Sequence, residues 1–143
     1  ALQEEMNTMW ESTSTDPRIS ELNGTWSTCM ADAGFPGLAA VGDAENSIYD
    51  QVNAIYDAAY SNVDPNVEMT EEDYKAIDDG VQDDLAAITP VEIKTAVADF
   101  TCREKIGYDE VQQKVNFELQ QEFVDTHKED LDAWLAAYKD AQG

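Results

Sequence analysis

Apolar residues recur at intervals of three and four almost everywhere in this sequence, which is the period of an α-helix. The clearest stretch runs from Ile19 to Ala33, where a single helical face carries Trp26, Cys29 and Met30. No stretch alternates apolar and polar residues over the length of a strand. The sequence therefore predicts an all-α fold.

Capping residues mark several helix boundaries. Asp16 followed by Pro17 predicts the start of a helix that ends at Gly34, and Thr70 predicts the start of another. Thr89-Pro90-Val91-Glu92 combines an N-cap, a first-position proline and a capping-box glutamate. The predicted elements are a loosely packed N-terminal helix within 1–15, helices at about 17–34, 45–60, 70–88 and 89–107, and a loop at 34–44.

The predicted helix at 89–107 carries apolar residues on two opposite faces. One face includes Ile93, Val97 and Phe100, and the other includes Cys102 and Ile106. A helix that is apolar on two sides packs between neighbours. We therefore expect one compact domain over residues 1–143, with five or six helices around this central helix.

The last segment, 108–141, contains neither glycine nor proline. Its apolar stripe shifts around the helix, from the side of Val115 to the side that carries Phe123 and Leu131. A long curved helix and a break near Asp125-Thr126 both explain this shift. The favoured interpretation is a single long C-terminal helix.

The charge balance excludes some classes of partner. The 143 residues include 31 acidic and only 8 basic side chains, for a net charge of −23. Nucleic-acid binding needs clustered lysine and arginine, and an anionic membrane surface repels such a chain. The longest apolar run, 34–42, is far shorter than a membrane span. We therefore expect no nucleic-acid partner and no transmembrane segment.

The two cysteines, Cys29 and Cys102, lie far apart and do not form a metal-binding pair, since a single histidine cannot complete a zinc site with them. The favoured interpretation is a disulfide made in an oxidising compartment, and the alternative is two separate buried thiols. Because the chain begins at Ala1, we also expect that a leading segment has been removed, and the cysteines favour an export signal.

No catalytic motif and no cofactor motif stands out, so we expect neither catalytic residues, nor a metal, nor a cofactor. Nine acidic residues lie within 64–84, but no calcium-binding loop accompanies them, and a solvated surface is the favoured interpretation. Asp99 is the best single candidate for an acid–base group, but the favoured interpretation is a pair with Arg103 four residues later. His127 lies in an apolar stripe and is interpreted as a packed boundary residue.

The candidate binding residues are aromatic and apolar. Tyr49, Tyr56 and Tyr60 lie along one edge of the helix at 45–60, beside its expected buried face. Phe35 and Leu38 lie in the glycine-rich loop before it. Tyrosine rings give rigid amphipathic contact area. The favoured interpretation of this spacing is boundary packing with the hydroxyls in solvent. If the chain binds a partner, we predict that this edge and loop form the binding surface.

The residues around the two cysteines also resemble those of a known group of proteins. Trp26-x-x-Cys29-Met30-x-x-x-Gly34-Phe35, Ala98-Asp99-x-x-Cys102-Arg103 and the tail at 120–131 resemble a group of small actinobacterial secreted or lipid-anchored proteins of unknown function. The resemblance implies an all-helical extracytoplasmic domain whose two cysteines pair. It implies no activity and no site residues.

The predicted function is that of a non-enzymatic binding or accessory protein of the cell envelope, secreted or lipid-anchored. Its partner would be an envelope component or a small ligand. The alternative is a small carboxylate-dependent enzyme that acts on envelope glycan, which would need a desolvated carboxyl pair in one cleft.

Overall fold

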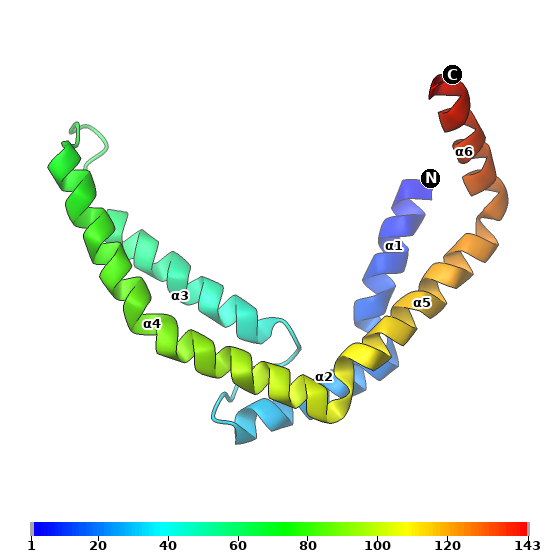
Figure 1. Cartoon of the computed structure of the whole chain (residues 1–143), viewed down its shortest axis with the longest axis horizontal. Coiled ribbons are helices and arrows are strands. Elements are labelled where there is room, and N and C mark those ends of the chain that lie inside the picture. Colours follow the sequence, from blue (N-terminus) through cyan, green and yellow to red (C-terminus); the bar gives the residue numbers. More distant parts are fainter. Residues whose placement is uncertain (1, 143) are drawn as a thin grey trace. The chain divides into compact units, whose positions relative to one another are not determined.

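The computed structural model describes residues 2–142, and every regular element within them is an α-helix. Ala1 and Gly143, the ends of the predicted domain, lie outside the described residues. Figure 1 shows the helices in chain order: α1 (Leu2–Thr15), α2 (Pro17–Asp32), α3 (Asp43–Tyr60), α4 (Glu71–Ile106), α5 (Tyr108–Thr126) and α6 (Lys128–Gln142). The all-α fold class and the predicted number of helices are confirmed.

Contacts along the chain define two compact units. The middle unit comprises residues 26–102, and the terminal unit comprises residues 1–25 together with 103–143. The boundaries fall inside α2 and α4, next to the two cysteines.

In the middle unit, α2 is fastened to α4 at two points. The Sγ atoms of Cys29 and Cys102 lie at the disulfide-bonding distance of 2.06 Å, with the Cα atoms 5.8 Å apart. One turn earlier on each helix, Nε1 of Trp26 donates a hydrogen bond of 2.9 Å to Asp99. Trp26 and Met30 are fully buried beside this link. The cysteine pairing predicted from the sequence is thus the one that the structure brings together.

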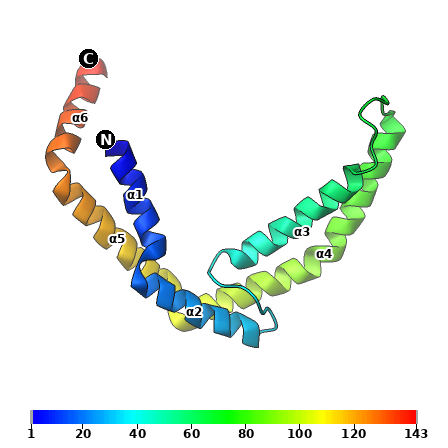
Figure 2. The same cartoon turned by 180° about the vertical axis from the view of Figure 1, so that it is seen from behind.

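Helix α3 lies alongside α4 within the middle unit, as Figures 1 and 2 both show. Ala44 and Val81 are buried, while Ile48, Val52 and Ile55 are half-buried. The predicted inward face of this helix is therefore confirmed in direction, although its burial is incomplete.

Two helix ends in this unit follow their sequence signals closely. Gly34 has a φ of 95°, and the N–H of Phe35 donates to the carbonyl of Met30, which is a Schellman ending. At the start of α4, Thr70 and Asp73 cap each other: the Asp73 N–H donates to Oγ1 of Thr70, and the Asp73 carboxylate accepts from the Thr70 N–H. Both boundaries were predicted from the sequence.

The terminal unit joins α1 to α5, which lie side by side in Figures 1 and 2. Oγ1 of Thr13 donates a hydrogen bond of 3.0 Å to Asn116. Val115 and Tyr108 on α5 are buried. The first helix carries no fully buried residue, as expected for a loosely packed N-terminal helix.

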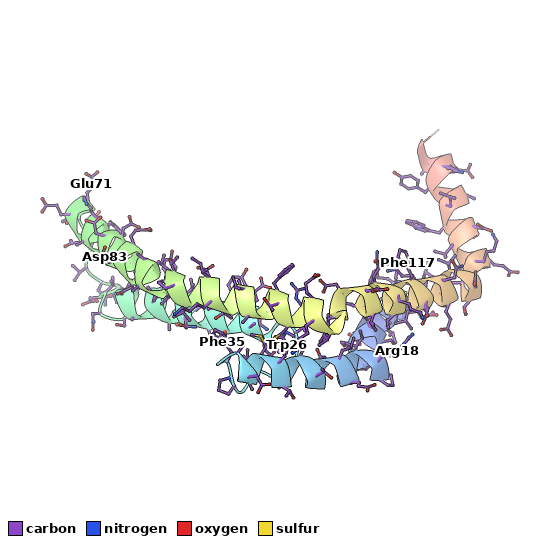
Figure 3. All side chains as sticks on the ribbon, turned by 60° about the horizontal axis from the view of Figure 1, so that its bottom comes forward. Arg18, Trp26, Phe35, Glu71, Asp83 and Phe117 are labelled. Carbon is purple, nitrogen blue, oxygen red and sulfur yellow. A yellow bond between two sulfur atoms is a disulfide. The ribbon has the colours of Figure 1, made fainter. Side chains whose placement is uncertain are left out.

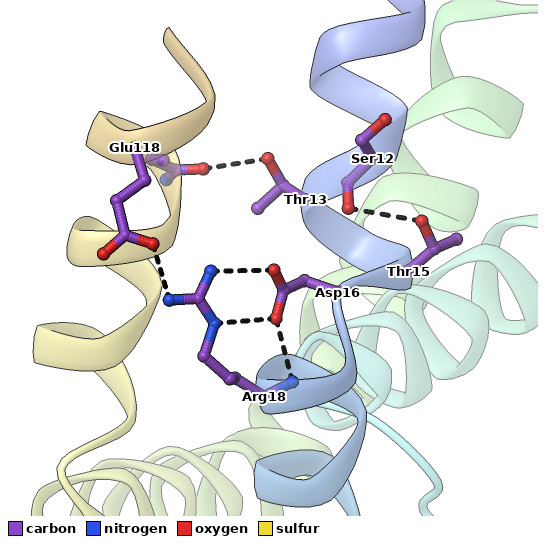
Figure 4. Close-up of polar contacts among 7 residues, drawn as sticks. Ser12, Thr13, Thr15, Asp16, Arg18 and Glu118 are labelled. Atoms are coloured by element: carbon purple, nitrogen blue, oxygen red, sulfur yellow. Dashed lines mark hydrogen bonds and ion pairs between the residues drawn. The ribbon is translucent and has the colours of Figure 1, made fainter. Parts of the chain in front are cut away.

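Arg18 closes the turn between α1 and α2 (Figure 4). Its guanidinium contacts Asp16 through two hydrogen bonds, of 3.0 and 2.9 Å, and reaches Glu118 on α5 at 2.6 Å. The carboxylate of Asp16 also accepts the backbone N–H of Arg18, which confirms it as the N-cap of α2. Hydrogen bonds from Arg18 lower the pKa of the Asp16 carboxyl.

The predicted break at Thr89 is wrong, because α4 runs from Glu71 to Ile106 through Pro90. The Thr89 hydroxyl bonds backward to the carbonyl of Leu85 at 3.0 Å. The buried residues on the two sides of the proline, including Val81 and Cys102, all belong to this one helix. Packing along a continuous helix therefore overrides the local start signal.

The predicted two-sided burial of the 89–107 segment is also wrong. Its inner side is buried at Thr95 and Cys102, but Ile93, Val97 and Phe100 on the opposite side are 57%, 60% and 58% exposed. Tyr74 on the preceding part of α4 is exposed as well.

A single C-terminal helix is not observed. Helix α5 ends at Thr126, His127 leaves the helical conformation with a φ of −109°, and α6 begins at Lys128. The alternative of a break near Asp125-Thr126 is therefore correct.

We predict that the disulfide contributes about 4 kcal/mol to stability, because it closes a loop with a sequence separation of 73 residues. The urea midpoint of the oxidised protein should lie well above that of the reduced protein. A Cys29→Ser/Cys102→Ser variant should match the reduced protein and should not respond to reductant. Two free thiols in protein prepared under oxidising conditions, or equal midpoints, would contradict this prediction.

Candidate functional site

The tyrosine edge of α3, defined as Tyr49, Tyr56 and Tyr60, faces solvent. The three residues are 57%, 43% and 49% exposed. The helical period puts them beside the half-buried face of α3 rather than on it, so their rings stay outside while Val52 and Ile55 pack inward. Exposures of about one half agree both with boundary packing that leaves the hydroxyls in solvent and with a binding edge. Whether the edge binds a partner stays a prediction.

Carboxylates and amides surround this edge, and no basic residue lies on α3. Glu45 lies four residues before Tyr49, and Asp57 lies three residues before Tyr60, so each is a neighbour on the helix surface. Asn53 lies between them, four residues after Tyr49. The edge can therefore offer aromatic faces together with hydrogen-bond acceptors and negative charge.

The loop before α3 is held in place by side-chain hydrogen bonds. The Ser27 hydroxyl donates to the carbonyl of Leu38 at 2.6 Å, and the Asp43 carboxylate accepts the N–H groups of Ala39 and Ala40 at 2.8 and 3.0 Å. Phe35 and Leu38 themselves are half-buried. These two residues offer less free area than the tyrosines and help to anchor the loop on α2.

Asp99, the candidate acid–base residue, has a structural contact. Its carboxylate accepts the indole N–H of the fully buried Trp26. This hydrogen bond satisfies a donor that would otherwise be buried without a partner. The geometry therefore explains Asp99 by the attachment of α2 to α4.

The aspartates with shifted pKa values do not resemble general acids. Hydrogen bonds from Asn66 lower the pKa of Asp64, and hydrogen bonds from Thr70 lower the pKa of Asp73. A general acid at neutral pH needs a raised pKa, as produced by desolvation in a cleft. Both carboxyl groups are instead ionised hydrogen-bond acceptors near the loop between α3 and α4.

His127 links three helices of the terminal unit. It follows α5 directly, stacks on Phe123 with ring centroids 4.3 Å apart, and contacts the Phe123 carbonyl through Nδ1 at 3.0 Å. Its Nε2 lies 2.5 Å from the carboxylate of Glu5 on α1, an ion pair when the imidazole is protonated. The hydrogen bond to Glu5, followed by that to Phe123, raises the pKa of His127. The predicted boundary position is confirmed, and the ion pair is a feature that periodicity could not predict.

This raised pKa predicts that the docking of α1 depends on pH. A folded-state pKa above the unfolded value stabilises the fold fully at pH values below the unfolded pKa, and the contribution is lost as pH rises through the folded pKa. The urea midpoint should therefore fall between pH 6 and pH 9 by more in the natural protein than in His127→Gln. Equal pH dependence in the two proteins would exclude a role for the Glu5–His127 pair.

Sequence reasoning missed two exposed apolar stripes. On α4 the stripe consists of Ile93, Val97 and Phe100, together with Ala96. On α6, Trp134 and Tyr138 are more than half exposed. Periodicity identifies an apolar face, but it does not show whether another element covers that face.

The acidic excess lies along outward positions of α4, for example at Glu71 and Asp83, which Figure 3 labels. Among residues 2–142, no group of three or more His, Cys, Asp or Glu side chains has an arrangement that could hold a metal ion. A few acidic side chains form ion pairs within the chain. One of them is Asp79, which pairs with Lys75 at 2.5 Å.

We therefore predict that calcium acts on this chain only through ionic strength. CaCl₂ and NaCl at equal ionic strength should produce the same melting temperature. MgCl₂ serves as the control for divalent charge. A saturable rise in melting temperature at micromolar Ca²⁺, absent with the other two salts, would reveal a specific site.

Comparison of the chain with family models, with curated proteins and with solved structures finds no match.

Proposed function

We propose that this protein is a non-enzymatic binding or accessory protein that works outside the cytoplasm, at the cell envelope. The tyrosine edge of α3 is the observation that carries the proposal. Three neighbouring aromatic residues exposed along one helix edge provide contact area that a stable helix does not need for its own packing. Tyrosine is also enriched at the centres of protein interfaces.

The cysteine pair supports the proposed compartment. Disulfides persist in oxidising environments and are rare in the cytosol, and Cys29 and Cys102 lie at bonding distance. Within residues 2–142, no helix combines the length and the apolar composition that crossing a membrane requires. Secretion and attachment by a lipid anchor are both forms of the proposed location.

The carboxylates with a shifted pKa, and Asp99, have structural contacts that account for them without catalysis. Those with a shifted pKa are held ionised by hydrogen bonds, and Asp99 is used to attach Trp26. Backbone and side-chain hydrogen bonds also fix the loop that carries Leu38. A rigid aromatic edge beside a fixed loop suits a preformed recognition surface, which loses little entropy when it binds.

The proposal predicts that the tyrosine edge is required for binding to the envelope fraction of the source cells. Tyr49→Ala/Tyr56→Ala/Tyr60→Ala should lower the affinity for that fraction at least about tenfold, because interface aromatics cost about 1 kcal/mol or more each when truncated. Binding is measured by titration of labelled protein into washed envelope, and unchanged circular dichroism and melting temperature show that the variant is folded.

Phe117→Ala/Trp134→Ala is the matched control, because it removes two comparably exposed aromatic residues from the terminal unit. It should leave the affinity within about twofold of the natural protein. A triple tyrosine variant that folds and binds like the natural protein would contradict the proposed function.

A further inference from the structure

Negative charge is concentrated on α3, on the loop that follows it and on the first half of α4. Residues 43–90 contain 13 acidic side chains and a single basic one, Lys75, which is itself paired with Asp79. The rest of α4 differs sharply, because residues 91–106 contain three acidic and three basic side chains. The tyrosine edge therefore lies in the most negative part of the middle unit.

The geometry of the edge suits regularly spaced ligand groups. At a rise of about 1.5 Å per residue, Tyr49 and Tyr56 lie about 10 Å apart along the helix, and Tyr56 and Tyr60 about 6 Å apart. Glu45 is one turn from Tyr49, and Asp57 is one turn from Tyr60. A cation placed on an outer ring can thus reach both an aromatic face and a carboxylate.

We propose that the tyrosine edge of α3 binds a lysine- or arginine-rich segment of a protein partner. This inference rests on the proposed function and adds the chemistry of the partner. Helix α3 is complementary to such a segment, because it combines exposed tyrosine rings with four carboxylates and contains no lysine or arginine.

Each component of such a segment has a counterpart on α3. The aliphatic stem of lysine or arginine packs on a tyrosine ring, and its charged end interacts with the ring face and with a neighbouring carboxylate. The charge of residues 43–90 accelerates encounter with a cationic segment and repels an anionic one. Uncharged segments gain only the contact with the rings.

Three labelled peptides test the inference by fluorescence anisotropy on the intact, oxidised protein. All are alanine-rich helices with three substituted positions at the spacing of the three tyrosines; the first carries lysine there, the second glutamine and the third glutamate. The lysine peptide should bind at least about tenfold more tightly than the glutamine peptide, and the glutamate peptide should not bind. The affinity for the lysine peptide should fall as the NaCl concentration is raised.

Two charge variants separate a specific site from general attraction. Glu45→Gln/Asp50→Asn/Asp57→Asn removes three carboxylates from α3, and Glu110→Gln/Glu129→Gln/Asp140→Asn removes three from the terminal unit. The α3 variant should bind the lysine peptide about tenfold more weakly than the natural protein, and the terminal-unit variant should lose less than about twofold. The triple tyrosine variant should also bind the lysine peptide about tenfold more weakly.

Equal losses in the two charge variants would overturn the inference, because attraction would then be general. Equal binding of the lysine and glutamine peptides would also overturn it, as would absence of lysine-peptide binding. An uncharged chitin oligosaccharide is the fourth probe, and tyrosine-dependent binding of it in place of the lysine peptide would assign the edge to glycan. In these cases the proposed function is judged separately, by the loss of envelope binding in the triple tyrosine variant.

Discussion

The attachment of α2 to α4 is the constraint on which the middle unit depends. The Cys29–Cys102 bond and the hydrogen bond from Trp26 to Asp99 lie one turn apart and join the two ends of this unit. Few other side chains of the unit are fully buried, and Met30 is the largest among those that flank the link. In a small domain with a thin core, a cross-link supplies stability that burial alone cannot. The link also offsets the mutual repulsion of 13 acidic side chains in residues 43–90.

Because the α2–α4 link supplies part of the stability of the middle unit, α3 can keep an exposed aromatic edge. Because the ends of the unit are held covalently, α3 needs to bury only the side that carries Val52 and Ile55, and both residues are half-buried. Tyr49, Tyr56 and Tyr60 are left outside. The same argument holds on α4, where one side carries the buried Cys102 and the opposite side exposes Phe100. A scaffold of this kind displays residues instead of enclosing them.

Local chemistry made several features predictable from the sequence. The caps at Asp16 and Thr70 need only neighbouring residues, and the cysteine pairing follows from two inward-facing positions. The helix start predicted at Thr89 is wrong, because the Thr89 hydroxyl donates a hydrogen bond to the carbonyl of Leu85 within a continuous helix. Periodicity placed the tyrosine edge correctly beside a buried face. It could not show that Phe100 lies uncovered, because coverage depends on distant segments, and it cannot identify a partner that lies outside the chain.

Hydrogen–deuterium exchange of the oxidised and reduced proteins tests most directly the claim that the α2–α4 link organises the middle unit. We predict that reduction accelerates exchange at 26–32 and 92–102 and through α3, while the amides of α1 and α5 keep their protection. Protection that is unchanged throughout 26–102 after reduction would contradict the account, because the helices would then be held by their packing alone.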